Sequence, residues 1–378
     1  MLAEQIPWLW LRFVGALLTA FCIAYFTVPP VKRFAESIGA VDMPNARRIN
    51  KVPVPRMGGI AIFCGFILSA LLFVEMSDQI TGILIGCLIV TQMGGLDDVF
   101  NLNPWLKLAG QVVAALVCVA FGVVADVVTN FFVIGGDTML YLPRAFSGIV
   151  TVFWIVACTN AINLIDGLDG LAVGMSTISA VTLFAISLSV EFTDPNVSLL
   201  LLCIIGGCCG FWPYNRNPAK IFMGDVGSQM LGYMLAALSV LGLFKMHALV
   251  TMLLPFLALA VPLADTLFAF VRRIAEGKSP FHADKGHLHH RLLAMGLTQR
   301  QAVAVMYSFS ILFGIFAFLM IGKTRRVKII CLAIVFLILL GIALYVYRIY
   351  PRKKEKRYSG SEMVEEDIKI YSKERKRK

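Results

Sequence analysis

The sequence predicts an all-α polytopic membrane protein, one that crosses the bilayer many times. Of its 378 residues, 58% are hydrophobic, and the mean hydropathy is +0.80. Soluble domains are much less apolar than this. Apolar runs of roughly twenty residues, the length that spans a bilayer as a helix, recur along the chain. No long polar stretch separates them, so we expect no separate soluble domain.

Eleven apolar runs are long enough for a membrane-spanning helix. They cover residues 7–29, 58–76, 80–96, 104–125, 147–163, 170–190, 197–213, 226–244, 248–271, 301–321 and 327–347. The runs at 80–96 and 147–163 are short. We therefore predict about eleven transmembrane helices in a single domain over residues 1–347, followed by a basic cytoplasmic tail over residues 348–378.

Lysine and arginine indicate which helix ends face the cytoplasm, because short cytoplasmic loops are enriched in both. With the N-terminus outside, 27 of the 34 Lys and Arg residues fall in inside segments, and twelve of these are in the tail. Of the remaining seven, four cluster within residues 323–328, on the outside, and are the main exception. A basic cluster beside a membrane attracts anionic lipid, so we favour membrane lipid, and no nucleic acid, as the partner of the tail.

A small β-hairpin is expected in the extracytoplasmic segment 126–146. Two β-prone runs, 131–134 and 138–142, flank the triplet Gly135-Gly136-Asp137. Short strands on either side of glycine and aspartate are typical of hairpins.

Four polar islands interrupt or border the apolar runs, and the predicted topology places all of them on the cytoplasmic side. They occupy residues 94–98, 160–170, 214–228 and 282–291. An even number of predicted spans separates each island from the next. A carboxylate inside a membrane costs roughly 2.5–3.5 kcal/mol on insertion scales, so such groups usually mark function. We predict one composite site built from the four islands.

The islands contain five aspartates: Asp97, Asp98, Asp166, Asp169 and Asp225. On one face their charges would repel one another unless a cation or basic groups compensated them. A hard divalent cation with oxygen ligands, shared with phosphates, fits Mg²⁺ best. Two other interpretations stay open. Asp97 and Asp98 alone could be a hydrated helix end, and a proton-coupled transporter also collects carboxylates within the membrane.

Four of the five histidines lie within residues 282–290, beside Lys285 and Arg291. This clustering favours an anion-binding loop in which imidazole donates to phosphate oxygens. A structural zinc site is one rival, but no cysteine is near, and the adjacent pair His289 and His290 suits chelation poorly. A solvated loop with incidental histidines is the other rival.

Two further residues have open interpretations. Phe222, three residues before Asp225, could stack on a nucleobase, although a lone Phe more often belongs to the core. The backbone N–H groups at the start of the following span could receive phosphate. Asp265, within the ninth span, could simply pair with a cation near the inner surface.

Together, the four islands resemble those of the polyprenyl-phosphate N-acetylhexosamine-1-phosphate transferases. The resemblance covers nearly the whole chain, from Pro-Val-Pro-Arg-Met-Gly-Gly at 53–59 to the histidine loop, in matching order. The segment His-Leu-His-His-Arg-Leu at 287–292 is similar to the branch that starts wall teichoic acid, enterobacterial common antigen or O-antigen by moving GlcNAc-1-phosphate. The branch that makes peptidoglycan lipid I usually carries a run of histidines followed by an acidic residue.

The resemblance implies a reaction. UDP-GlcNAc and undecaprenyl phosphate would give undecaprenyl-diphosphate-GlcNAc and UMP, with Mg²⁺ or alternatively Mn²⁺ as cofactor. The protein would lie in the bacterial cytoplasmic membrane, with a catalytic domain over residues 1–347 whose site faces the cytoplasm, and a homodimer is a further expectation. The basic tail is not carried over from the family.

Site residues follow from the same resemblance. Asp97 and Asp98 match the paired aspartates of the catalytic centre, one of which would act as a base, and Lys107 matches a position that holds the diphosphate. The resemblance implies that Asp225 and Asn163 hold the metal. The remaining matches are the nucleotide-binding positions Asn160, Asp166, Asp169, Asn215 and Phe222, and the phosphate-contacting His287, His289 and His290.

Two alternatives to this function remain. Within the enzyme class, the chain could use a different UDP-amino sugar, including UDP-MurNAc-pentapeptide. From another class, it could be a proton-coupled transporter. That hypothesis is weaker because the islands sit at span ends and the two halves of the sequence do not look alike.

Overall fold

The computed structural model describes residues 2–43, 53–129, 139–189, 194–243, 253–275 and 287–321, together with Val327 and Ile330. The chain forms two compact units. The first comprises Met1–Asp42 and Val54–Ile321, and the second comprises Met43–Pro53 and Gly322–Lys378. All the helices and strands given below belong to the first unit. Most of the predicted span 327–347, and all of the tail, lie outside the described residues.

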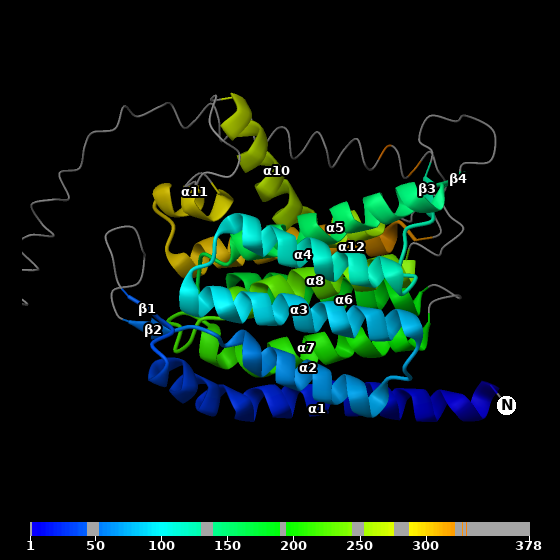
Figure 1. Cartoon of the computed structure of the whole chain (residues 1–378), viewed down its shortest axis with the longest axis horizontal. Helices are drawn as coiled ribbons and strands as arrows, with labels where there is room; N and C mark the ends of the chain where they lie inside the picture. The colour runs from blue at the N-terminus through cyan, green and yellow to red at the C-terminus, as the bar shows by residue number, and fades with distance from the viewer. Residues whose placement is uncertain are drawn as a thin grey trace, which may run out of the picture. The chain divides into compact units, whose positions relative to one another are not determined.

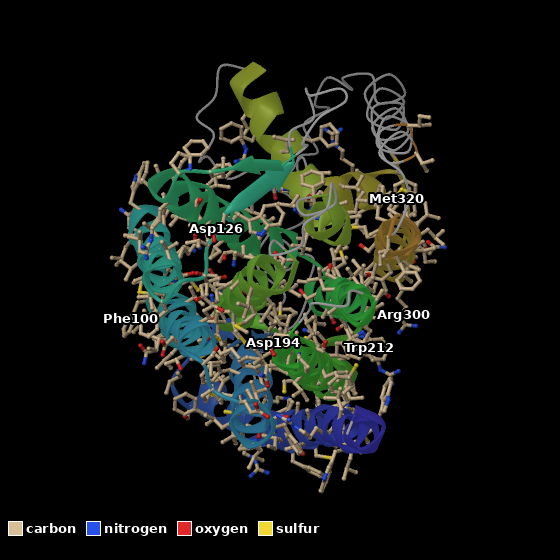
Figure 2. All side chains as sticks on the ribbon, turned by 90° about the vertical axis from the view of Figure 1, so that its right-hand side faces the viewer. Phe100, Asp126, Asp194, Trp212, Arg300 and Met320 are labelled. Carbon is tan, nitrogen blue, oxygen red and sulfur yellow. The ribbon has the colours of Figure 1, made fainter. Side chains whose placement is uncertain are left out.

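Long α-helices dominate the first unit, and most of them lie side by side (Figure 1). They are α1 (Leu2–Ser37), α2 (Gly59–Phe73), α3 (Asp78–Phe100), α4 (Pro104–Ala120), α5 (Arg144–Ile165), α6 (Leu171–Leu188), α7 (Pro195–Asn215), α8 (Gly224–Leu243), α9 (Leu253–Ala258), α10 (Ala260–Ala275), α11 (Leu288–Ala294) and α12 (Gln299–Leu319). Figure 2 views the bundle nearly along the helices, with side chains filling the space between them.

Helix α8 occupies the centre of this bundle. It packs against α2, α3, α5, α6 and α7, and its residues Met230, Leu231 and Tyr233 are completely buried. Glycine allows the closest contacts, because a side chain would keep the backbones apart. A Cβ atom on Gly94 of α3 would lie only 2.5 Å from the backbone oxygen of Asp225 on α8. The start of α8 is therefore held directly against the end of α3.

Polar residues between the apolar runs define where the helices begin. The side chain of Ser77 accepts a hydrogen bond from the N–H of Ile80 at the start of α3. Asn103 accepts one from the N–H of Trp105 at the start of α4, where Pro104 is the first helical residue. These caps satisfy N–H groups that have no partner within the helix. The short connections predicted between apolar runs are thus formed by residues suited to helix ends.

The membrane-spanning character predicted from the sequence is present in the described helices. Six of them, α1, α3, α5, α6, α7 and α12, are long and apolar enough to cross a membrane, and α2, α4 and part of α10 are shorter apolar helices. Large apolar side chains face outward, including Phe26 and Phe153, each 72% exposed. An apolar exterior on this scale is unusual for a soluble protein. The protein is therefore a multi-pass membrane protein.

The ninth apolar run does not form the single span predicted over residues 248–271. The structure breaks it at Leu259 into α9 and α10. Pro262 lacks the N–H that would bond to the carbonyl of Ala258 in a continuous helix. That carbonyl instead accepts a hydrogen bond of 2.6 Å from the hydroxyl of Ser179 on α6. The prediction of one continuous helix was wrong. Pro262 cannot donate to the carbonyl of Ala258, and Ser179 of α6 donates to it instead.

Two short antiparallel strand pairs accompany the helices. Strands β3 (Val127–Thr129) and β4 (Met139–Tyr141) pair with each other, which confirms the predicted strand pairing in segment 126–146. The first strand precedes the expected run 131–134, which lies outside the described residues. The second pair, β1 (Val41–Asp42) with β2 (Val54–Pro55), was not predicted.

Candidate functional site

The centre of the candidate site is a lysine held between two carboxylates from different helices. The Nζ atom of Lys107 on α4 lies 2.8 Å from Oδ2 of Asp97 on α3 and 3.1 Å from Oδ2 of Asp225 on α8. Asp97 also accepts a hydrogen bond of 2.7 Å from the N–H of Leu102, just past the end of α3. The structure therefore brings together aspartates from two separate islands and Lys107, a predicted site residue that lies outside the islands.

Asp98 faces a different partner from its neighbour. Its two carboxylate oxygens accept hydrogen bonds from the N–H groups of Asp225 and Val226, at 3.0 and 3.1 Å. These are two of the N–H groups in the first turn of α8, which have no partner within the helix, and a carboxylate is favoured at a helix N-terminus. Only 6% of Asp98 is exposed. In this arrangement Asp98 positions α8 and caps its start.

Backbone pairing with residues 55–59 fixes the approach to α8. The N–H of Phe222 donates to the carbonyl of Pro55, and the N–H groups of Gly58 and Gly59 donate to the carbonyls of Phe222 and Met223, all at 2.8 Å. A Cβ atom on Gly59 would lie 2.2 Å from the backbone nitrogen of Gly227. The glycine pair is thus required by the close approach of two backbones. Phe222 itself is only partly buried.

A chain of side-chain amides continues from the lysine and its carboxylates into the bundle. Asn160 on α5 donates to Oε1 of Gln111 on α4 at 2.6 Å, and Gln111 donates to Oε1 of Gln229 on α8 at 3.2 Å. Gln229 donates to Oδ2 of Asp225 at 3.3 Å. Sequence reasoning did not single out Gln111 or Gln229, although each is a polar residue within an apolar run, the signal that identified the aspartates.

Asn163, the other predicted metal ligand, lies one turn beyond Asn160 on α5. Its Nδ2 atom donates a hydrogen bond of 2.9 Å to the hydroxyl of Ser228 on α8. With its nitrogen turned to Ser228, the oxygen of the amide is the atom that would be offered to a cation.

Asp169 and Asn215 join the loop after α5 to the loop after α7. Oδ2 of Asp169 accepts from the Nδ2 of Asn217 at 2.9 Å and from the N–H of Ala219 at 3.0 Å. Asn215 accepts from the N–H of Gly170 at 3.1 Å and donates to the carbonyl of Ile221 at 3.0 Å. Both side chains are buried. These bonds shape the two loops that the sequence assigned to nucleotide binding.

The pKa of Asp166, at the end of α5, depends on burial and on the charges near it. Burial, followed by the nearby carboxylates of Asp225 and Asp98, raises the pKa of Asp166 to about 8. Burial alone disfavours the charged form of a carboxyl group, and neighbouring carboxylates add to that effect. A cation bound near Asp98, Asp166 and Asp225 would offset the second contribution.

His287 is oriented by a carboxylate from another helix. Its Nδ1 lies 3.0 Å from Oδ2 of Asp265 on α10, and Oδ1 of the same carboxylate accepts from the N–H of Leu288 at 2.7 Å. Asp265 therefore pairs with the histidine segment, which identifies the partner that the sequence left open. The predicted loop is partly helical, because α11 begins directly after His287.

His289 connects the histidines to the loop after α5. A Cβ atom on Gly167 would lie 2.5 Å from Nε2 of His289, so the imidazole packs directly on that loop. Only 2% of His289 is exposed, and its Nδ1 has no hydrogen-bond partner among the described residues. Burial, and next the neighbouring His290, lower its pKa to about 4. His290 lies beside it with a ring separation of 4.3 Å, whereas His282 lies outside the described residues.

The described donors fit a hard cation that relies partly on substrate. Within residues that the structure describes, no three His, Cys, Asp or Glu side chains converge as metal ligands do. Magnesium is usually bound by one or two carboxylates together with waters and substrate phosphates. Asp225, with the amide oxygen of Asn163 and the nearby carboxylates of Asp97 and Asp98, matches that pattern.

An apolar groove runs along α4 and α5. Its volume is about 610 Å³. It extends from Arg144, at the start of α5, to Ala157, one turn before Asn160, and its walls include Val112, Leu116, Val152 and Phe153. The groove thus ends next to the amide chain that leads to Asp225.

Comparison with known proteins gives consistent matches. Residues 80–243 match the model of glycosyl transferase family 4. The chain is 40% identical over 326 residues to a probable undecaprenyl-phosphate N-acetylglucosaminyl 1-phosphate transferase of Bacillus subtilis, covering 86% of this chain and 88% of the relative. It is 37% identical over 325 residues to a decaprenyl-phosphate N-acetylglucosaminephosphotransferase of Mycobacterium tuberculosis, covering 79% of each.

A more distant relative is also named as a polyprenyl-phosphate N-acetylglucosaminyl 1-phosphate transferase. The chain is 28% identical over 283 residues to an undecaprenyl-phosphate alpha-N-acetylglucosaminyl 1-phosphate transferase of Escherichia coli, covering 73% of this chain and 75% of the relative. The family model thus includes Asp97, Lys107, Asp225 and the amides between them, and each of these relatives matches at least 73% of this chain.

Proposed function

The chain belongs to the polyprenyl-phosphate N-acetylhexosamine-1-phosphate transferase family, and from this premise we propose that it transfers GlcNAc-1-phosphate from UDP-GlcNAc to undecaprenyl phosphate. An oxygen of the lipid phosphate would form a bond to the sugar-linked phosphorus of UDP-GlcNAc. The bond from that phosphorus to the oxygen of UMP would break, and UMP would leave. The observation that carries this proposal is Lys107 held between Asp97 and Asp225, on the same helix whose later residues, from Val112, line an apolar groove.

The main obstacle to this reaction is repulsion between two phosphate groups, each of which carries negative charge. Lys107 is placed to neutralise phosphate oxygens, and positioning with charge compensation accounts for most catalysis of phosphoryl transfer. Asp225 and Asn163 would hold Mg²⁺, or Mn²⁺ in its place, which when bound would stabilise the charge on the phosphates and on the leaving UMP.

A strong general base is not needed in this proposal. A phosphomonoester has a second pKa of about 6, so much of the lipid phosphate is already deprotonated at neutral pH. Both Asp97 and Asp98 are engaged in hydrogen bonds within the protein. We therefore favour direct transfer over a covalent phosphoaspartate.

The histidine segment would contact phosphate oxygens. Because Asp265 faces Nδ1 of His287, the Nε2 atom of that imidazole is the one left for a ligand. His289, whose pKa is lowered to about 4, stays neutral at physiological pH and would contribute as a neutral group. Asn160, Asp166, Asp169, Asn215 and Phe222 would shape or line the nucleotide pocket.

The groove along α4 and α5 suits the polyprenyl chain of the acceptor. Its apolar walls would hold the isoprenoid tail while the phosphate extends beyond Val112 toward Lys107, five residues earlier on α4. We further propose about eleven membrane crossings within a catalytic domain over residues 1–347, a cytoplasmic basic tail over residues 348–378, and a site on the cytoplasmic face of a bacterial inner membrane, in a protein that forms a homodimer. The cytoplasmic face is where a water-soluble UDP-sugar is available.

Purified protein in detergent tests the proposal. Undecaprenyl phosphate is supplied with UDP-GlcNAc or with UDP-MurNAc-pentapeptide, and UMP release is measured with Mg²⁺ and with EDTA. We expect UMP from UDP-GlcNAc alone, abolished by EDTA. Release only from the pentapeptide sugar would move the chain to the lipid I branch. A folded protein that releases no UMP from any UDP-sugar would reopen the transporter hypothesis.

A further inference from the structure

The chain of amides behind Asp225 has a fixed direction. A carboxylate only accepts hydrogen bonds, so Gln229 must turn its NH₂ group toward Asp225. Its Oε1 then faces Gln111 and must accept, and Gln111 in turn accepts from Asn160. Each amide therefore donates toward Asp225 and accepts from the amide behind it.

The chain is buried and joins three helices. Gln111 is 3% exposed and Gln229 is 1% exposed, so neither amide can exchange its partner for bulk water at little cost. Hydrogen bonds that run in one direction polarise one another and gain strength in a medium of low polarity. The orientation of each side chain thus depends on the next.

The chain ends on the same oxygen that Lys107 contacts. Oδ2 of Asp225 receives both the ammonium of Lys107, at 3.1 Å, and the amide of Gln229, at 3.3 Å. Two donors from different helices on one oxygen restrict the rotation of the carboxylate. Without Gln229, Oδ2 would lose one of these two donors, and the other, Lys107, is shared with Asp97. Asp225 also has side-chain contacts with Asp97 and Asn163.

We infer that Gln229 and Gln111 are positioning residues, which together with Asn160 hold the carboxylate of Asp225 in the orientation that binds a divalent cation. This inference rests on the role of Asp225 in the proposed function. Partners that orient a metal ligand typically change metal affinity by 10–100-fold when they are removed. Gln111 reaches Asp225 only through Gln229. Once Gln229 is lost, losing Gln111 as well should therefore have no further effect on Asp225.

The test uses the full-length protein in detergent and the variants Gln229→Met, Gln111→Met and the double variant. Methionine keeps the length of glutamine without its amide. Gln79→Met is the matched control, because Gln79 on α3 donates to the backbone carbonyl of Gly122 at 2.9 Å, at the opposite end of that helix from Asp97. Mn²⁺ binding is measured by electron paramagnetic resonance with and without UDP-GlcNAc, and melting temperatures identify folded variants.

We expect Gln229→Met to weaken Mn²⁺ binding about 10–100-fold and Gln111→Met to weaken it less. The double variant should match Gln229→Met within about twofold, and Gln79→Met should match the wild type. In the UMP assay, excess Mg²⁺ should restore the kcat of the weakened variants, which a misfolded protein would not allow.

Wild-type Mn²⁺ affinity in folded Gln229→Met would overturn the inference. The inference would also be overturned if the fold-losses of Mn²⁺ affinity from Gln229→Met and Gln111→Met multiplied in the double variant, because the effects of independent residues combine in that way. A wild type that binds no Mn²⁺ in either condition would overturn it as well. If the wild type binds Mn²⁺ but releases no UMP, the proposed function fails while the comparison of binding among the variants still decides this inference.

Discussion

Asp97 and Asp98 are neighbours in the sequence but do different work in the fold. Successive residues of a helix point about 100° apart, so the two carboxylates meet different elements. Asp97 bonds to Lys107, whereas Asp98 bonds to the backbone at the start of α8. Asp225, in turn, meets Lys107 and Gln229 and is the proposed ligand of the cation. The three aspartates should therefore differ in what their loss costs.

Asp225→Ala should lower kcat for UMP release by roughly 10³-fold, a typical effect for a group that organises transition-state charge. Asp97→Asn should cost only about 10–100-fold, because the amide oxygen can still accept from the N–H of Leu102. Steady-state kinetics of the folded variants measure both. A larger loss in Asp97→Asn than in Asp225→Ala, or a trapped radiolabelled acyl phosphate on Asp97 or Asp98, would contradict direct transfer without a base.

The buried His289 should make stability depend on pH. Its pKa is about 4 in the fold and about 6.5 in an unfolded chain. Between these values the unfolded state binds the proton, so stability is present above pH 6.5 and is lost as pH falls to 4. The full shift corresponds to about 3 kcal/mol. His289→Gln should lose this part of the pH dependence in denaturation experiments, and equal slopes for both proteins would refute it.

At the scale of elements, the site depends on how closely α8 approaches α3 and residues 55–59. Gly224 has a φ of +73°, and a Cβ atom there would lie 2.3 Å from Oδ2 of Asp98. The conformation and the space both require glycine. Gly39, with a φ of +74°, has open space around its Cβ position. Alanine at Gly39 would strain only the backbone, whereas alanine at Gly224 would also collide with Asp98. Comparing the two substitutions therefore separates the two costs.

Gly39→Ala should reduce the free energy of unfolding by about 1 kcal/mol and leave UMP release unchanged, because only backbone conformation is strained. Gly224→Ala should cost more, about 2–4 kcal/mol, and should lower kcat because it displaces the cap of α8. Chemical denaturation and the UMP assay are run on both. Equal losses in the two variants would mean that the contact with Asp98 does not position α8.

The positions of most helices could be predicted from the sequence, but contacts between distant residues could not. The apolar runs predicted α1 to α8 and α12 to within a few residues at most ends, because burial in lipid imposes length and composition. They did not reveal the break at Leu259, which depends on Pro262 and on a bond from Ser179. They also missed the pairing of β1 with β2, strands of two residues each.

Within the site, residue types were predictable but partners were not. Aspartates beside apolar runs were conspicuous, and Lys107, Asp97 and Asp225 do come together. The pairing of Asp265 with His287, and the chain through Gln111 and Gln229, join residues far apart in sequence. Such contacts depend on the angles and depths at which helices pack, and no local pattern contains them.

At the scale of the whole molecule, the proposed function brings together two substrates of opposite character, one lipid-soluble and one water-soluble. The apolar groove on α4 and α5 ends one turn before Asn160, and the polar cluster begins there. One substrate can thus stay in lipid while the other arrives from water. The proposed reaction therefore requires that a phosphorus atom of the soluble substrate becomes part of a lipid.

The most direct test of that claim follows the phosphorus itself. UDP-GlcNAc labelled with ³²P on the sugar-linked phosphate is incubated with the purified protein, Mg²⁺ and undecaprenyl phosphate, and the products are separated between organic and aqueous phases. Transfer of GlcNAc-1-phosphate predicts ³²P in the lipid fraction, in an amount equal to the UMP released. A lipid product that contains the sugar but no ³²P, with the label remaining in soluble UDP, would contradict the account.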